Sequence, residues 1–263
     1  MKQQLNINKN RPKKSLGQNF IKDHNFTLKL SSLISSDYET NIFEIGPGMG
    51  ALTQHLVKKK FKKLFLIEKD IRFYKDLNSE FKNNNKIITI NCDALSYDYE
   101  NANKKSKSLV IGNLPFNIST QLLIKWITGD QWPPYYLKMI LMFQKEVADR
   151  IVSMPNQKSY SRISVIAQAR CKVKKVLNAP SDIFFPKPKV DGTVLEFTPI
   201  LKNKNINILN LQSLLKKSFE HRRKKIKTTL KDYDNLLRIL KIDGNLRAEN
   251  LSVEDYCKLA SAI

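Results

Sequence analysis

A short run at residues 110–120, VIGNLPFNIST, combines residue types that can do chemistry on a nucleic-acid base. The side-chain oxygen of Asn113 and the backbone carbonyl of Leu114 are two acceptors, which together can hold both protons of an exocyclic amine and aim its lone pair. Pro115 stiffens the turn and removes a competing N–H donor. Phe116 offers a flat face for an unstacked base. An ordinary turn with a core phenylalanine uses the same residue types, so this run alone leaves both interpretations open.

A glycine turn in FEIGPGMGALTQHL, residues 43–56, indicates what reacts with that base. Gly46 and Gly48 belong to a G-x-G-x-G spacing, which differs from the G-x-G-x-x-G fingerprint of dinucleotide binders. Glu44 precedes the turn, where a carboxylate repels a pyrophosphate and attracts a positive centre. S-adenosylmethionine carries a sulfonium and an ammonium and no phosphate, so the turn predicts this cofactor.

Two further acids follow predicted strands. Glu68 ends the strand in LIEKD, about twenty residues beyond the glycine turn, where an acid can accept both ribose hydroxyls. Asp93 follows the next strand in NCDAL and can accept a hydrogen bond from the amine of adenine. Carboxylates after strands are commonly helix caps, so each acid alone is weak evidence. Several acids at successive strand ends beside a glycine turn favour a cofactor site.

The elements that must position these residues alternate between β-rich and helical patterns, which predicts an α/β fold with a doubly wound, mostly parallel sheet. The last two predicted strands flank the proline-rich loop APSDIFFPKPK without a helix between them, so we expect an antiparallel hairpin at the sheet edge. The predicted strands are residues 42–45, 63–67, 87–90, 109–111, 137–143, 169–177 and 194–197.

The pattern becomes helical after residue 200, with predicted helices at 211–220, 221–240 and 253–263. We therefore expect a sheet domain over residues 1–200 and a small all-α domain over 201–263. The segment KKSFEHRRKKIKTTL, residues 216–230, has seven basic residues and one acid. Such a helix is strained unless an anion compensates it, which predicts an RNA contact; a solvated cationic face is the alternative. The contact is assigned to Arg222, Arg223, Lys224 and Lys225.

Composition supports a polyanionic partner. The chain has 46 Lys and Arg against 24 Asp and Glu, a formal net charge of +22, although lysine-rich codon bias is an alternative source. The three cysteines and three histidines have no metal-ligand spacing, so neither a metal site nor a disulfide framework is expected. No stretch has the length of a membrane span and residues 1–10 have no apolar signal core. We expect a cytoplasmic monomer.

Two loops complete the predicted site. The N-terminal KKSLGQNFIKD joins a basic arm to residues 17–20, and such an arm folded over a cofactor would exclude water. Phe184 lies in the proline-stiffened DIFFPKPKV, where it either stacks on the target base or packs against the sheet.

The motifs together resemble the ribosomal small-subunit RNA adenine dimethyltransferase family, of the KsgA type, a branch of the Rossmann-like class I methyltransferases. The match covers nearly the whole chain, and GQNF with NLPFNIST is its most specific part. The matching strings are KKSLGQNF, EIGPGMGALT, LIEKD, CDAL, IGNLPFNIST, MFQKEVADRI, YSRISVIAQ, FFPKPKVDG and FEHRRKKIKTTL.

The resemblance implies transfer of two methyl groups from S-adenosylmethionine to each of two adjacent adenosines in a hairpin loop near the 3′ end of small-subunit ribosomal RNA, during subunit assembly. Residues 113–116 match the family's catalytic loop, with Phe116 where many relatives have tyrosine, and Phe184 matches the aromatic that helps to hold the base. The positions that match cofactor contacts are Asn19, Ile21, Gly46, Glu68, Asp93 and Asn113.

Two rivals remain at this stage. A sister enzyme that modifies large-subunit RNA and confers antibiotic resistance shares GQNF and a related NLPF-type loop. A nucleic-acid-binding factor on the same fold could lack catalysis, although a pure binder has no reason to keep Glu68, Asp93 and Asn113 in a cationic surface.

Overall fold

The computed structural model describes residues 11–103, 106–129, 131–201 and 206–263 of the 263-residue chain. Residues 1–10, where no signal core is predicted, and 202–205 of the segment after the predicted domain boundary lie outside the described residues.

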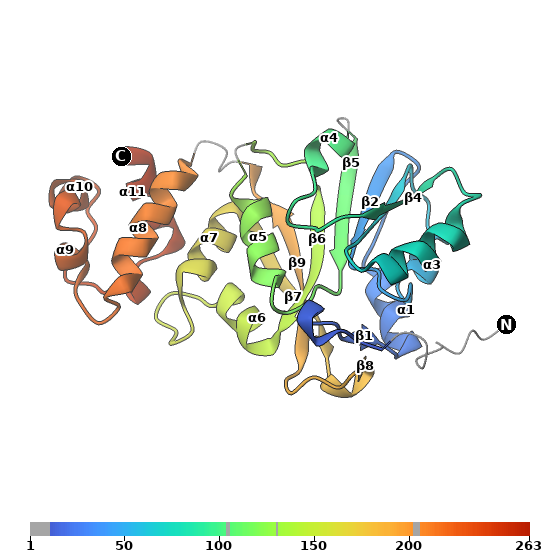
Figure 1. The fold of residues 1–263 in the computed structure, drawn as a ribbon. Coiled ribbons are helices and arrows are strands. Elements are labelled where there is room, and N and C mark those ends of the chain that lie inside the picture. Colours follow the sequence, from blue (N-terminus) through green and yellow to red (C-terminus); the bar gives the residue numbers. More distant parts are fainter. Residues whose placement is uncertain (1–10, 104–105, 130, 202–205) are drawn as a thin grey trace. The chain divides into compact units, whose positions relative to one another are not determined.

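Seven strands form one sheet in the order β4-β3-β2-β5-β6-β9-β7 (Figure 1). The first five strands in this order are parallel, and β9 runs antiparallel to β6. The predicted α/β class with a mostly parallel sheet and an antiparallel edge is confirmed. The strands are β2 (Thr40–Ile45), β3 (Leu64–Glu68), β4 (Ile87–Asn91), β5 (Lys107–Gly112), β6 (Lys138–Gln144), β7 (Cys171–Ala179) and β9 (Gly192–Pro199).

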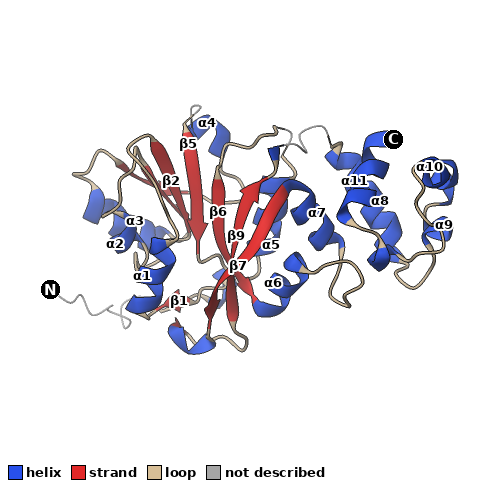
Figure 2. Cartoon of the chain, turned by 180° about the vertical axis from the view of Figure 1, so that it is seen from behind, coloured by secondary structure: helices blue, strands red, loops and turns tan. Residues whose placement is uncertain are grey.

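The central strands are buried on both faces, as near-continuous apolar runs in parallel sheets should be. All six residues of β2 and all five of β3 are buried. Figure 2 shows the sheet from behind, with β6, β9 and β7 side by side at the edge predicted for the hairpin. The intervening helices are α1 (His24–Ser32), α2 (Thr53–Leu56), α3 (Ile71–Phe81), α4 (Tyr99–Asn103), α5 (Ser119–Ile127), α6 (Lys145–Val152) and α7 (Arg162–Arg170).

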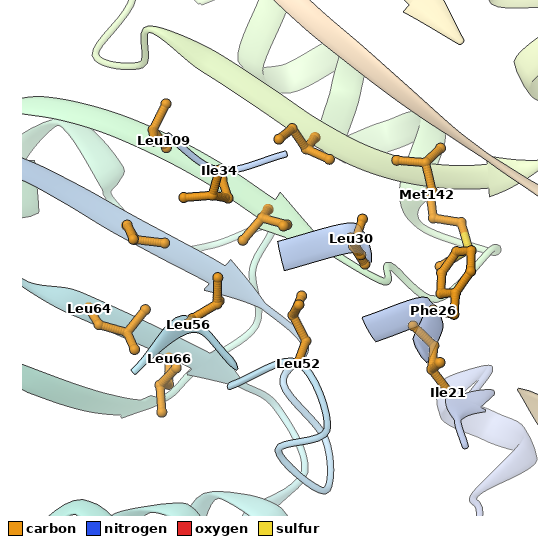
Figure 3. Close-up of a cluster of buried hydrophobic side chains, with 14 of the residues drawn as sticks. Ile21, Phe26, Leu30, Ile34, Leu52, Leu56, Leu64, Leu66, Leu109 and Met142 are labelled. Atoms are coloured by element: carbon orange, nitrogen blue, oxygen red, sulfur yellow. The ribbon is translucent and has the colours of Figure 1, made fainter. Parts of the chain in front are cut away.

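A buried apolar cluster joins α1 and α2 to the sheet (Figure 3). Phe26 and Leu30 of α1, Leu56 of α2, Leu66 of β3 and Met142 of β6 belong to it. Burial of a side chain of this size contributes about 1.5–3 kcal/mol. This packing fixes α1 and α2, and with them the two segments next to these helices, namely the N-terminal arm and the glycine turn.

A second, two-stranded sheet connects distant parts of the chain. β1 (Phe20–Ile21) pairs antiparallel with β8 (Phe184–Phe185), and the backbone N–H of Lys22 donates to the Ile183 carbonyl at 2.8 Å. The arm is thereby bound to the loop between β7 and β9. Neither strand was predicted, because two residues carry no periodicity.

The chain divides into two compact units, each built from discontinuous segments. One comprises the described residues of 1–123, 135–145 and 175–197, and the other those of 124–134, 146–174 and 198–263. The second unit contains α8 (Ile208–Glu220), α9 (Ile226–Thr229), α10 (Asp234–Ile239) and α11 (Val253–Ala262). The helical character after residue 200 agrees with the sequence, whereas the division into domains at that residue stays a prediction.

Two predicted elements are wrong in extent. The strand predicted from residue 169 begins at Cys171, because α7 continues to Arg170. The helix predicted over 221–240 is interrupted, since residues 221–225 form a turn and bridge between α8 and α9. A helix there would stack like charges on successive turns, which is unfavourable.

Candidate functional site

The turn between β2 and α2 contains two glycines with positive φ, one of which also makes a close approach. Gly46 (φ +65°) and Gly48 (φ +54°) adopt the left-handed conformation that glycine tolerates. A Cβ on Gly48 would lie 3.0 Å from Cε1 of Phe20, so that ring rests on the turn. A Cβ on Gly46 would lie 3.9 Å from the Asn113 carbonyl oxygen, an ordinary van der Waals contact, so the positive φ and not crowding requires glycine at this position.

A pocket of about 1160 Å³, part of it open solvent, lies along the carboxyl ends of β2, β3, β4 and β5. Ligands of open α/β sheets bind at this edge. The N-terminal arm contributes residues 15–21 to its lining. The predicted site residues that line it are Asn19, Ile21, Glu44, Gly46, Gly48, Glu68, Asp93, Asn113, Leu114, Pro115 and Phe116.

Glu44 is buried and points towards α2. The Thr53 hydroxyl donates to Glu44 Oε2 at 2.7 Å. Desolvation raises the pKa of Glu44 to about 8, and the Thr53 hydrogen bond opposes that rise only in part. The side chain is therefore mostly protonated at neutral pH when no cation lies beside it, so the predicted attraction of its carboxylate for a positive centre needs the proton to leave first.

Glu68 holds the glycine turn to the end of β3. The backbone N–H of Gly48 donates to one carboxylate oxygen at 2.9 Å and that of Asp70 to the other at 2.7 Å. Each carboxylate oxygen can accept two hydrogen bonds, so capacity remains for hydroxyl donors in the pocket. Burial raises the pKa of Glu68, while the two backbone donors oppose the rise.

Asp93 is held at the end of β4 by two donors. Lys69 Nζ lies 2.7 Å from its Oδ2, and the backbone N–H of Leu95 donates to Oδ1 at 2.9 Å. Lys69 also lines the pocket and is more than half exposed. An amine that approaches Asp93 from the pocket would share its carboxylate with this lysine.

The carboxamide of Asn113 lies in the pocket in a defined orientation. Its Nδ2 donates to the backbone carbonyl of Asn19 at 2.8 Å. The oxygen of the carboxamide thus stays available as an acceptor. Gly17 packs beside the same loop, since a Cβ on it would lie 2.8 Å from Oδ1 of Asn117. Strand β5 and the arm therefore position Asn113 together.

An acid that sequence reasoning missed anchors the arm. Asp70, whose side chain has no exposed surface, accepts from Nε2 of Gln18 at 3.0 Å. Its other partners are Arg72, at 2.7 Å and 3.0 Å, and Lys13, whose Nζ lies 3.8 Å away. The Arg72 guanidinium holds the pKa of Asp70 well below its usual range. In the sequence, Asp70 and Arg72 follow LIEK, and this pattern by itself indicates only a helix cap.

Phe20 completes the attachment of the arm. Its ring packs edge-on against Phe73 of α3 with centroids 5.2 Å apart, and rests on Gly48. The sequence indicated GQNF as a motif but did not indicate that Phe20 contacts Phe73. Phe73 lies on α3, far along the chain, and no local pattern links the two rings.

The two aromatics assigned to the base lie differently. Phe116 is half-buried and lines the pocket. Phe184 is 1% exposed, belongs to the buried cluster and does not line the pocket. The structure therefore does not bring Phe184 to the other site residues, and its role in holding the base stays a prediction that requires its ring to leave the core.

The basic residues 222–225 lie in the turn that replaces the predicted helix. Arg222 is compensated within the protein, since its Nη2 lies 2.5 Å from Glu249 Oε2 and also donates to the Lys158 carbonyl. Lys225 donates from Nζ to Oδ1 of Asn245 at 3.2 Å. Arg223 and Lys224 are exposed, and no ion pair of the described residues includes them. These two remain the stronger candidates for an RNA contact.

The pocket residues fit S-adenosylmethionine. Glu68 and Asp93 offer acceptors for hydroxyl and amine donors, and the backbone of Gly46 and Gly48 lines the same pocket. No group of three or more potential metal ligands occurs among the described residues. No helix in the described ranges is long and apolar enough to cross a membrane.

Known proteins resemble the chain over nearly its full length. A family described as ribosomal RNA adenine dimethylase matches residues 9–263. The protein named ribosomal RNA small subunit methyltransferase A from Anaplasma phagocytophilum (strain HZ) is 41% identical over 98% of this chain and 97% of its own. Its namesake from Rhizobium etli (strain CIAT 652) is 35% identical over 95% and 92%.

Two solved structures share the fold. A dimethyladenosine transferase from Plasmodium falciparum superposes with a TM-score of 0.80 at 25% identity, over 91% of this chain and 95% of that one. The 23S rRNA methyltransferase ErmE superposes with a TM-score of 0.68 at 19% identity, over 91% of this chain and 97% of that one, which shows a similar fold.

Proposed function

The chain belongs to the ribosomal RNA adenine dimethylase family, and from that premise we propose that it dimethylates the exocyclic amines of two adjacent adenosines in a 3′-terminal hairpin loop of small-subunit ribosomal RNA. The methyl donor is S-adenosylmethionine, and the setting is ribosome assembly. The full-length likeness to relatives named for the small subunit supports this substrate over large-subunit RNA.

The orientation of the Asn113 carboxamide is the observation that carries the proposal. The exocyclic amine of adenine is a poor nucleophile, because its lone pair is delocalised into the ring. Asn113 Oδ1 and the Leu114 carbonyl accept its two protons and turn the lone pair outward. The bond from Nδ2 of Asn113 to the Asn19 carbonyl fixes which amide atom meets the substrate. No strong general base is required, since the amine proton becomes acidic once the methyl group has arrived, and it can then pass to water.

In this proposal, residues at the ends of β2, β3 and β4 would hold the cofactor. When bound, the cofactor would supply an electrophilic methyl group. Glu68 would accept hydrogen bonds from the ribose hydroxyls of the cofactor. Asp93, which also binds Lys69, would accept a hydrogen bond from the amine of the cofactor's adenine. Glu44 loses its proton when a cationic group lies beside it. The arm excludes water over the site.

Phe116 supplies the face on which the target base stacks after it leaves the RNA stack. Arg223 and Lys224 contact RNA phosphates from the turn before α9. The proposal includes a cytoplasmic location and a monomer.

Methyl incorporation tests the proposed function. The full-length protein is mixed with labelled S-adenosylmethionine and with small subunits, their free RNA, or large-subunit RNA, each lacking the modification. Labelled dimethyladenosine in small-subunit RNA is the expected product. Incorporation only into large-subunit RNA identifies the rival enzyme, and RNA binding without incorporation into any RNA identifies a non-catalytic factor.

A further inference from the structure

Lysines gather at the amino ends of β2, β3, β4 and β5, the ends opposite the pocket. Figure 1 shows the amino end of β5 beside α4. Strands of five or six residues place these lysines roughly 17–20 Å from the carboxyl ends. The surface that they form consists of Tyr38 and the lysines Lys60, Lys62, Lys63, Lys86 and Lys107, here called the amino-edge surface.

Contacts within one compact unit show that this surface is continuous. Nζ of Lys60 and Nζ of Lys86 lie 5.6 Å and 5.4 Å from the centroid of the Tyr38 ring. The backbone carbonyl of Lys86 accepts from Leu64 at the start of β3. Lys107 begins β5 opposite Thr40 of β2.

Some of the lysines are held in place without being neutralised. Lys62 donates from Nζ to the Ser106 hydroxyl at 3.1 Å, and Lys63 donates to the Asn85 carbonyl at 2.8 Å. In the described part of the chain no ion pair includes any of the five lysines. The exposed acids Asp37 and Glu39 lie in the same turn as Tyr38, and the Asp37 carboxylate accepts from the Thr40 hydroxyl at 2.5 Å. The Thr40 hydrogen bond and the nearby charge of Lys107 both lower the pKa of Asp37, so this acid offsets part of the Lys107 charge. Two acids against five lysines still leave the surface cationic.

Tyr38 is 60% exposed, and no other Phe, Tyr or Trp among the described residues is exposed. Exposed aromatics surrounded by cations are the ordinary elements of single-strand nucleic-acid binding, in which bases stack on the ring and phosphates contact the charges. All the cations are lysines, which act as point charges, whereas base edges in duplexes are read by the planar fork of arginine. This chemistry suits a flexible single strand bound without sequence preference.

We propose that the amino-edge surface binds a single-stranded segment of RNA. Phosphates bind Lys60, Lys62 and Lys86 and draw the Lys60 and Lys86 ammonium groups away from the Tyr38 ring, on which a base then stacks. Resting on the proposed function, the segment belongs to the RNA substrate, beyond the part that enters the pocket. The surface adds affinity for extended substrates and touches no reacting atom.

Binding of a labelled oligouridine to the full-length protein tests the surface directly. Replacing Lys60, Lys62 and Lys86 with glutamine should weaken binding and reduce the salt slope of the affinity by about 2, at roughly 0.7 per phosphate contact. The matched control replaces the exposed Lys29, Lys75 and Lys172 with glutamine, which removes the same charge elsewhere.

Tyr38→Ala should weaken oligouridine binding about tenfold, and Tyr38→Phe should retain it, because stacking needs the ring and not the hydroxyl. If the triple lysine variant and its control bind alike, or if Tyr38→Ala binds as wild type, the proposal is wrong and the lysines are a solvated face.

Methylation separates this inference from the proposed function. On a short hairpin confined to the pocket, Tyr38→Ala should keep the wild-type rate, whereas on unmodified small subunits its KM should rise. A wild-type protein that methylates no RNA contradicts the proposed function, while the oligouridine measurement still decides the amino-edge surface.

Discussion

The side chain of Asn113 carries a donor and an acceptor on one carbon, and the Asn19 carbonyl binds the donor. The position of Asn113 at a strand end follows from the apolar run before it, so it was predictable. Its partner was not, because the two residues are 94 positions apart and no local pattern links them.

Asn113→Ala should reduce methyl transfer at least a hundredfold, as loss of one positioned polar group does in other active sites. RNA affinity should remain nearly unchanged, since the amide orients the base amine rather than the backbone. Single-turnover rates and RNA binding, measured on the same preparation, check this. Asn101→Ala, which removes an exposed amide on α4, is the control. Normal turnover in Asn113→Ala would remove the acceptor role.

Glu44 gives the free protein a pH-dependent stability. Its pKa is about 8 when folded and near 4.5 when unfolded, so between these values the folded state holds more protons than the unfolded chain. The free energy of unfolding therefore falls as pH rises through this window, by at most about 5 kcal/mol.

Glu44→Gln should remove that dependence, because the neutral amide is isosteric with the protonated acid. Its free energy of unfolding should exceed that of wild type near pH 8, and the two proteins should converge towards pH 5. Chemical denaturation at several pH values measures this. Cofactor affinity should rise with pH in wild type, as the carboxylate forms, and stay flat in the variant. A wild-type stability that is constant across the window would contradict the buried, protonated state.

Phe184 and Phe185 show a limit of residue-level reasoning. Both lie in the proline-stiffened loop DIFFPKPKV, and the sequence assigned Phe184 to the base. Pairing with β1 turns Phe184 into the core and leaves Phe185 half-buried. The partner strand decides which ring is buried, and it lies at the other end of the chain.

At the scale of elements, the strands around the pocket were predictable because buried parallel strands form continuous apolar runs. The attachment of the arm was not, since it depends on single residues. Asp70 caps α3 through the Arg72 N–H and also binds Gln18.

Asp70→Asn separates these roles, because asparagine is an equally good N-cap but carries no charge. The arm should be held less firmly, so KM for S-adenosylmethionine should rise about tenfold while kcat changes little. Hydrogen exchange at residues 16–21 should become faster. Asp76→Asn removes an exposed acid from the same helix and should change neither quantity. Equal KM values for the two variants would show that Asp70 only caps α3.

The turn at residues 221–225 contains one cation paired with an acid, Arg222, and two exposed cations, Arg223 and Lys224. Arg222→Gln breaks the partly exposed pair with Glu249 and should lower stability by about 0.5 kcal/mol. Replacing Arg223 and Lys224 with glutamine should leave stability unchanged and reduce the salt slope of RNA binding by about 1.5. Denaturation and salt titration of both variants check this, each serving as the control for the other. An unchanged slope in the double variant would exclude the turn from the RNA interface.

The whole molecule carries a net charge of +22, yet its cations differ in what they can do. Asp70 pairs with Arg72 and Lys13, and Glu249 pairs with Arg222, whereas the amino-edge lysines form no ion pair in the described ranges. Composition predicted a polyanionic partner, and only the folded chain separates compensated charges from available ones.

The salt slopes from the amino-edge surface and from the turn at residues 221–225 should therefore add. Combining the amino-edge substitutions with those at Arg223 and Lys224 should reduce the slope for small-subunit RNA by about 3.5, the sum of the two sets. Titration of the single and combined variants measures this. A combined slope no smaller than that of one set alone would mean that the two surfaces never hold the same RNA.

The short sheet formed by β1 and β8 can form only late in synthesis. β1 leaves the ribosome early, but the strand it pairs with is made only after most of the sheet. A nascent chain that ends before residue 184 has the glycine turn and NLPF and lacks the partner of its arm. Methyl-donor binding should thus mature abruptly during translation, when β8 emerges, and a new copy of this protein cannot become active on ribosomal RNA while most of its own chain is still to be made.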